Sequence, residues 1–204
     1  DNCEVWTDEP EMPGCDGSCQ AVVSVIDGAG VVEQEARRRQ RVIREVLRLG
    51  DERSWVEAAP PTLRGSPLSP STTLEYRLDY GPDGPIGRQN LEIQLSPESF
   101  RSELAPSRTF VLESEANAMV AQGIGLRTTC RDLLVLGENG PVDNQLRYED
   151  ECVRHKILDT LGDLSLAGLP IIGAFEGERT GHEMNHKLVT TLLADPSAWR
   201  IEEL

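Results

Sequence analysis

The sequence contains no run of about 18 apolar residues, which argues against a helix that spans a lipid bilayer. A signal peptide is also lacking at its start, so we expect a cytoplasmic protein. The chain also has no excess of basic residues. It contains 20 Lys and Arg and 35 Asp and Glu, which gives a formal net charge of -15. Affinity for nucleic-acid phosphates depends on Lys and Arg. We therefore expect no nucleic-acid partner and no stable membrane insertion.

Cysteine and histidine are both scarce. The five cysteines are odd in number and come without a secretory signal, so they predict free thiols rather than a disulfide framework. Cys15 and Cys19 are not followed by a second Cys or His pair at zinc spacing, which favours ordinary packing for both. The three histidines, His155, His182 and His186, lie close together in the sequence. Histidine chemistry is therefore confined to the last quarter of the chain.

Strand and helix patterns are mixed along the chain without strict alternation, which predicts an α+β fold. Period-two patterns and short apolar runs predict strands over residues 1–6, 41–49, 54–58, 73–80, 90–95, 132–136 and 171–175. Helices are expected over about 18–27, 114–122, 148–167 and 181–193. Ser96 and Pro97 are a cap and a first-turn proline, so they should open a further helix. The proline-rich segment 60–72 should be a loop.

The helix expected over 148–167 carries the most informative pattern. His155, Asp159 and Asp163 recur every four residues, a spacing that stacks an imidazole and two carboxylates on one helix face. Catalytic zinc takes neutral imidazole and carboxylate ligands of this kind. A buried face with such groups is costly unless a metal ion or a hydrogen-bond partner satisfies them. The spacing leaves two interpretations open, a metal site or a structural ion-pair face.

A second pattern, from His182 to His186, matches the H-E-x-x-H signature of metalloproteases. In that signature the two histidines bind zinc and the glutamate, here Glu183, is the general base. Only Glu202 or Glu203 follows as a distant third ligand. This interpretation leaves the pattern at 155–163 unexplained.

A third interpretation joins the two patterns. His155 and Asp159 bind a metal ion, and His182 on the following helix faces the same centre as an acid or an oxyanion stabiliser. Asp163 accepts a hydrogen bond from His182 and keeps it oriented. Lys156 adds a fixed positive charge for an anionic substrate. This arrangement still lacks a third metal ligand and a general base.

Several motifs taken together resemble the family of UDP-3-O-acyl-N-acetylglucosamine deacetylases, the zinc enzymes of bacterial lipid A synthesis. Residues 147–164 are similar to the metal helix of that family. Further similarities lie at 170–175, 180–188 and 107–110, and residues 16–18 resemble its D-G-S turn. Their order and spacing agree over essentially the whole chain, which is more specific than any one motif.

The resemblance implies two related domains, each a small sheet with two helices, with the helices packed between the sheets and the active site between the domains. Residues 1–33 would be the end of a truncated first domain, and 34–204 would form the second. The segment between Phe110 and Leu136 resembles a β-α-β insert that forms a passage for the acyl chain. The side chains that could line this passage are Leu112, Met119, Val120 and Ile124.

The resemblance also implies a reaction and a set of roles. The reaction is zinc-dependent hydrolysis of the N-acetyl group of a UDP-linked acylated amino sugar. The implied roles are zinc ligand for His155 and Asp159, catalytic histidine for His182, orientation of that histidine for Asp163, oxyanion donor for Thr109, and substrate contact for Lys156 and Phe110.

One part of the family pattern has no match in this sequence. The third zinc ligand of the family is a histidine, preceded by the glutamate that acts as general base, and no such pair occurs here. We expect both residues upstream of Asp1, so this chain alone would be incomplete for catalysis. A non-catalytic binding module of the same fold, or a metalloprotease, is the alternative.

Overall fold

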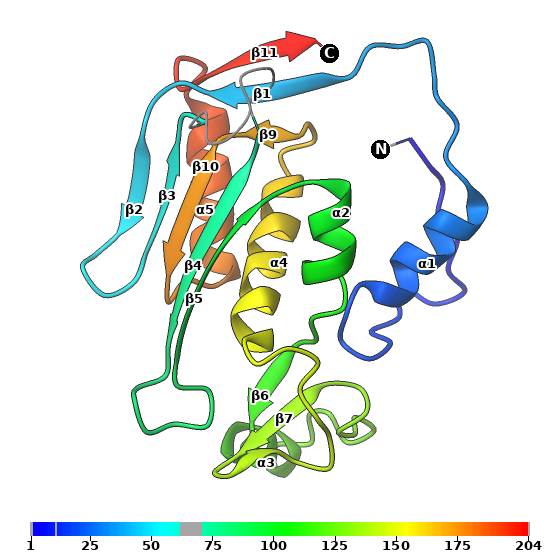
Figure 1. Ribbon diagram of the computed structural model, residues 1–204, viewed down its shortest axis with the longest axis vertical. Coiled ribbons are helices and arrows are strands. Elements are labelled where there is room, and N and C mark those ends of the chain that lie inside the picture. Colours follow the sequence, from blue (N-terminus) through cyan, green and yellow to red (C-terminus); the bar gives the residue numbers. More distant parts are fainter. Residues whose placement is uncertain (1, 11, 62–70, 204) are drawn as a thin grey trace.

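The structure, a computed structural model, describes residues 2–10, 12–61 and 71–203. These residues form three small sheets and several helices, which confirms the expected α+β class (Figure 1). The largest sheet contains β2 (Leu47–Gly50), β3 (Trp55–Ala59), β4 (Thr73–Asp79), β5 (Arg88–Gln94) and β10 (Ala174–Glu178). Its strand order is β2-β3-β10-β4-β5.

Two three-stranded sheets lie beyond it. One contains β1 (Arg39–Ile43), β9 (Ile171–Ile172) and β11 (Trp199–Glu203) in the order β11-β1-β9. The other contains β6 (Phe110–Leu112), β7 (Leu134–Gly137) and β8 (Gly140–Pro141) in that order. The helices are α1 (Gln20–Ala29), α2 (Pro97–Ser99), the π-helix η1 (Phe100–Leu104), α3 (Glu113–Ala121), α4 (Glu151–Ser165) and α5 (His182–Ala194).

The core lies between the five-stranded sheet and the helix pair α4 and α5. Helix α4 packs against β4 and β5, helix α5 packs against β2 and β3, and the two helices contact each other. Val153 and Ile157 of α4 and Leu188 and Leu192 of α5 are almost completely buried. Burial of each such side chain contributes about 1.5–3 kcal/mol, so this layer fixes α4 firmly against the sheet.

Local sequence signals predicted the hairpins and the helix caps correctly. Strands β2 and β3 pair antiparallel with Gly50 opposite Trp55, and β4 pairs antiparallel with β5. The side chain of Ser96 accepts a hydrogen bond from the backbone N–H of Ser99, with Pro97 in the first turn. The helix that opens there is short, because α2 continues directly as η1.

Two expected strands are wrong in the same way. The single strands predicted over 41–49 and 171–175 are each divided between the five-stranded sheet and the β11-β1-β9 sheet. Gly173 lies at the second break, where an added Cβ would be 2.8 Å from the Ala59 carbonyl oxygen and 2.9 Å from Ile43 Cγ1. Alternating polarity continues through the first break and an apolar run continues through the second, so neither pattern reveals where the chain passes from one sheet to the next.

The expected strand at the start of the chain is also wrong, since residues 2–7 have no strand conformation and Trp6 is exposed; residue 1 lies outside the described residues. Most of the loop predicted over 60–72 likewise falls on residues 62–70, outside them. Strand β11 was not predicted. Within the described ranges, no helix is both long and apolar enough to cross a bilayer.

Candidate metal and catalytic site

A cavity of about 380 Å³ lies where the first turns of α4 meet the ends of β4 and β6. Five of the seven predicted site residues line it: Thr109, Phe110, His155, Lys156 and Asp159. The remaining lining residues are Tyr76, Leu78, Asp79, Tyr80, Arg179 and Thr180. The structure thus brings together side chains that are more than 100 positions apart in the sequence.

His155 is held by the segment before β6. Its Nδ1 lies 3.2 Å from the carbonyl oxygen of Ser107, and its Nε2 lies 3.2 Å from Oδ1 of Asp159. When Nδ1 donates its proton to the carbonyl, Nε2 and the carboxylate oxygen present lone pairs to the same gap. A cation between two such donors relieves their repulsion, and both atom types are zinc ligands. The pair therefore fits a metal ion through its donor chemistry.

Asp159 is charged at neutral pH despite its burial. Burial alone would raise the pKa of this carboxyl, but its contacts with His155 and Lys156 hold the pKa at about 2. The Lys156 ammonium donates to Oδ2 of Asp159 at 2.9 Å. Burial would lower the pKa of Lys156, yet the Asp159 charge raises it above its usual value. The cavity wall therefore carries a fixed anion and a fixed cation side by side.

This carboxylate should give the chain an acid-dependent stability. Its folded pKa of about 2 lies below the ordinary aspartate value of about 3.9, so its contribution is complete above the ordinary value and is lost as the pH falls towards 2. The contribution is on the order of 2 kcal/mol. Urea unfolding with a chelator present should show wild type losing its advantage over Asp159→Asn between about pH 4 and pH 2. A difference between the two proteins that is constant over this range would contradict the assignment.

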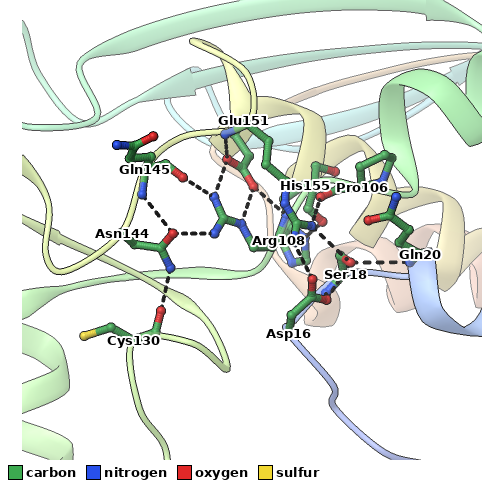
Figure 2. Close-up of polar contacts among 12 residues, drawn as sticks. Asp16, Ser18, Gln20, Pro106, Arg108, Cys130, Asn144, Gln145, Glu151 and His155 are labelled. Atoms are coloured by element: carbon green, nitrogen blue, oxygen red, sulfur yellow. Dashed lines mark hydrogen bonds and ion pairs between the residues drawn. The ribbon is translucent and has the colours of Figure 1, made fainter.

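A buried ion pair anchors the segment that holds His155 (Figure 2). Glu151, in the first turn of α4, accepts hydrogen bonds from Nε and Nη2 of Arg108 at 2.8 and 3.0 Å and from the backbone N–H of Arg108 at 3.1 Å. The Arg147 N–H also donates to Glu151, at 2.7 Å. Burial would raise the Glu151 pKa, but these hydrogen bonds hold it below its usual value.

The ion pair fixes the path of the chain on both sides of Arg108. Ser107 precedes it and presents the carbonyl group to His155, and Thr109 follows it at the cavity wall. The guanidinium of Arg108 also donates to Asn144 Oδ1 and to the Gln145 carbonyl oxygen (Figure 2). Residues 107–109 are thereby fastened to the start of α4 and to the loop before it.

The D-G-S turn at 16–18 supports the same segment from the other side. The Thr109 N–H donates to the Gly17 carbonyl oxygen at 2.8 Å. Gly17 has a φ of +79°, and an added Cβ would be 2.7 Å from Cγ2 of Thr109, so only glycine fits this contact. Arg147 pairs with Asp16 at 2.5 Å and donates to the Pro106 carbonyl oxygen at 2.7 Å. The turn therefore helps to place Thr109 at the cavity.

His182 and Asp163 form a separate cluster that does not line this cavity. The two oxygens of Asp163 lie 3.0 and 3.1 Å from Nδ1 of His182, as the joint interpretation predicts. Asn185 donates to Asp163 at 2.9 Å, and Nε2 of His186 lies 2.9 Å from the same carboxylate. Sequence reasoning missed this contact of His186. Within the described part of the chain, these two histidines and Asp163 also form a possible metal site, with ligand atoms within 4.8 Å of one another.

Six further lining residues escaped sequence reasoning, among them Tyr76, Tyr80 and Arg179. Tyr76 and Tyr80 lie in the period-two pattern over 73–80. That pattern predicted a strand, but it did not indicate which of its side chains face the cavity. The Tyr80 and Phe110 rings meet edge to face, and Phe110 meets His155 in the same way at 6.3 Å between ring centroids. Arg179 takes a φ of +52°, and its guanidinium donates to the Asp79 carbonyl oxygen. Two tyrosines four positions apart in the predicted strand, and so on the same face of it, were the signal for this wall.

The insert forms a second cavity, of about 500 Å³, that shares Thr109 and Phe110 with the first. Met119, Val120 and Ile124, three of the four residues predicted to line a passage, line this cavity, whereas Leu112 does not. The three strands and one helix of this region agree with the expected β-α-β insert, because β6 and β7 are parallel and α3 lies between them in sequence.

Comparison with known proteins gives one consistent result. The family model described as "LpxC: UDP-3-O-acyl N-acetylglycosamine deacetylase" matches residues 1–194. A UDP-3-O-acyl-N-acetylglucosamine deacetylase of Syntrophotalea carbinolica is 36% identical over 205 residues, which cover 100% of this chain and 63% of the relative. Relatives of the same name from Brucella ovis and Brucella canis are 37% identical, with 100% of this chain and 68% of each relative covered. The chain spans about two thirds of the length of these curated relatives.

Proposed function

Since the chain belongs to the UDP-3-O-acyl N-acetylglycosamine deacetylase family, we propose that its gene product hydrolyses the N-acetyl group of a UDP-linked, 3-O-acylated glucosamine. The reaction is an early step of lipid A synthesis and takes place in the bacterial cytoplasm. The observation that carries the proposal is the His155 and Asp159 pair, whose Nε2 and Oδ1 atoms lie 3.2 Å apart at the wall of the cavity. The family match favours this reaction over peptide hydrolysis by the H-E-x-x-H motif.

Zinc is the cofactor of the proposed reaction, and His155 and Asp159 are two of its ligands. Among the described residues, no third His, Cys, Asp or Glu forms a ligand cluster with this pair. We propose that a histidine and a glutamate outside this sequence supply the third ligand and the general base. Bound zinc would lower the pKa of its water ligand and polarise the amide carbonyl.

The domain division expected from the resemblance is part of the proposal. Residues 1–33 would belong to a first domain and 34–204 to a second. The contacts of helix α1 support this division. They lie near the two ends of the helix: Asp27 pairs with Arg101, and the Cys19 N–H donates to the Ala105 carbonyl oxygen. Val25 of α1 is exposed, as a side chain that packs against a further domain would be.

His182 is the proposed acid. Its Nδ1 is engaged by Asp163, so Nε2 is the nitrogen that can carry a proton towards the substrate. The cationic form of such a ring stabilises a developing oxyanion and then protonates the departing amine. Asp163 is a positioning residue, because its buried carboxylate contacts Nδ1 and holds the ring in place. His182 follows the cavity residue Thr180 by two positions, at the start of α5.

The other predicted residues take roles at the cavity wall. The Thr109 hydroxyl would donate to the developing oxyanion, a contact whose value is greatest in the transition state. Lys156 would attract the anionic sugar nucleotide, and the Phe110 ring would pack against the substrate. The adjoining cavity, lined by Met119, Val120 and Ile124, would take the acyl chain, since it shares the wall residues Thr109 and Phe110 with the site.

Removal of a zinc ligand tests the proposal. His155→Asn in the complete gene product should lower bound zinc after dialysis, because one of few ligands is lost. It should also cut kcat/KM for acetate release by at least about 100-fold. Ser165→Ala, an exposed change on the same helix, is the control and should leave both quantities unchanged.

The alternatives give different outcomes in this experiment. Zinc content and acetate release that are the same in His155→Asn and in wild type would remove His155 from the site. Wild-type protein that binds zinc but releases no acetate would favour the non-catalytic module. Cleavage of a peptide that depends on Glu183 would favour the metalloprotease.

A further inference from the structure

Asn185 lies near the start of α5 and is almost completely buried, with 1% of its surface exposed. Its side-chain amide donates to Oδ2 of Asp163 at 2.9 Å, and this carboxylate contacts Nδ1 of His182. We infer that Asn185 is a further positioning residue of the deacetylation, which holds Asp163 and, through it, the His182 ring. The inference rests on the proposed function, in which His182 is the acid.

The partners of Asn185 fix the orientation of its amide. An ionised carboxylate only accepts hydrogen bonds, so the group that faces Asp163 is the NH₂ group. The amide oxygen accepts a hydrogen bond from the Thr180 hydroxyl at 3.2 Å. A turn of the amide by half a rotation would set oxygen against the carboxylate. The side chain of Asn185 therefore has one orientation that satisfies both of its neighbours.

Thr180 connects this contact to the wall of the first cavity. Its backbone carbonyl oxygen accepts a hydrogen bond from the hydroxyl of Tyr76, on β4, at 2.7 Å. Thr180 and Tyr76 are both buried, and both line the cavity that His155 also lines. The series of contacts runs from the sheet to the carboxylate beside His182. It therefore sets where the ring lies relative to that cavity.

Asp163 needs a fixed partner because two rings approach it. Nδ1 of His182 lies 3.1 and 3.0 Å from its two oxygens, and Nε2 of His186 lies 2.9 Å from Oδ1. A neutral ring donates from only one of its nitrogens, whereas an amide NH₂ group always donates. The Asn185 amide holds Oδ2, which keeps the carboxylate directed at Nδ1 of His182. Nε2 of His182 is then the nitrogen left to act on the substrate.

Kinetics of the zinc-loaded, complete gene product test the inference. Asn185→Leu is similar in size but has no hydrogen to donate, so kcat for acetate release should fall by about 10- to 100-fold, as for loss of an outer partner of a functional side chain. KM should stay within about threefold of wild type, because Asn185 and Asp163 do not line the cavity.

Thr72→Val is the matched control. Like the test variant, it removes a buried side-chain hydrogen bond, here from the Thr72 hydroxyl to the Ile171 carbonyl oxygen at 3.0 Å. Thr72 does not belong to the contacts that lead to Asp163. Its replacement should lower the unfolding midpoint but leave kcat unchanged, which separates a positioning role from a general loss of stability.

The position of the ring proton gives a readout that does not depend on catalysis. Nitrogen-15 NMR shifts report which nitrogen of a neutral histidine ring carries the proton, and His182→Gln identifies the signals of His182 by their loss. In wild type the proton of the neutral ring should lie on Nδ1, towards Asp163. Asn185→Leu should move it in part to Nε2. Thr180→Val, which removes the hydroxyl that orients Asn185, should act in the same direction and decides the question if Asn185→Leu does not fold.

Three results would overturn the inference. They are a kcat of Asn185→Leu within about threefold of wild type, an equal loss of kcat in Thr72→Val, and a proton position that is unchanged in both Asn185→Leu and Thr180→Val. A wild-type enzyme that releases no acetate would instead remove the proposed function. The nitrogen shifts would still show whether Asn185 places the ring, so the two failures can be told apart.

Discussion

Replacement of His182 by glutamine should lower kcat/KM for acetate release from UDP-3-O-acyl-N-acetylglucosamine by about 10²- to 10⁴-fold, the range that a positioned acid or base contributes. Glutamine keeps a polar group near Asp163 but carries no titratable proton. The loss should appear mainly in kcat, because the ring acts on the transition state rather than on the bound substrate. The pH profile of kcat should also lose its basic limb.

Thr190→Ala is the matched control for this variant. Thr190 is exposed on the same helix, and its hydroxyl bonds only to the Lys187 carbonyl oxygen among the contacts of the described structure. Its kcat/KM should equal that of wild type. A His182→Gln enzyme within about threefold of wild type, well short of the expected loss, would show that another group supplies the proton.

Glu151→Ala should destabilise the protein by about 3–5 kcal/mol, because it leaves the buried guanidinium of Arg108 without its anion. The side chains of Arg108 and Glu151 are 6% and 0% exposed, so water cannot replace the lost partner. Chemical unfolding monitored by circular dichroism measures the change. The same variant should bind zinc more weakly at His155, since Ser107 and Thr109 would no longer be held against α4.

Two comparisons separate burial from charge in this experiment. Asp27→Ala breaks the exposed pair with Arg101 and should leave the unfolding midpoint unchanged. The double change Arg108→Met and Glu151→Leu should recover most of the stability, because no unpaired charge then remains buried. A loss for Glu151→Ala as small as that for Asp27→Ala would contradict the anchoring role.

The sequence predicts the parts of this structure that depend on local spacing. The four-residue recurrence of His155, Asp159 and Asp163 needs only helix geometry, and α4 presents these groups as expected. The hairpins at β2–β3 and β4–β5 follow from alternation and turn residues in the same way. Five of the seven predicted site residues share one cavity because the family motifs around them resemble a known arrangement.

What the sequence does not predict depends on how elements meet. Two of the predicted strands are interrupted where the chain passes from one sheet to another. At Gly173 the cause is the close approach of the Ala59 carbonyl oxygen on β3. Glu151 was noted only as part of an acidic helix start, yet it pairs with Arg108 more than 40 positions away. A third ligand for the H-E-x-x-H motif was sought at Glu202 or Glu203, whereas in the structure both histidines of the motif lie against Asp163 of α4.

The central claim is that this chain carries part of a zinc deacetylase site for a UDP-linked acylated amino sugar. The most direct measurement is acetate release from UDP-3-O-acyl-N-acetylglucosamine by the zinc-loaded, complete gene product. We predict one free amine on the sugar for each acetate released, with the reaction lost after chelation and restored by zinc. A folded, zinc-loaded protein that releases no acetate from this substrate would contradict the account.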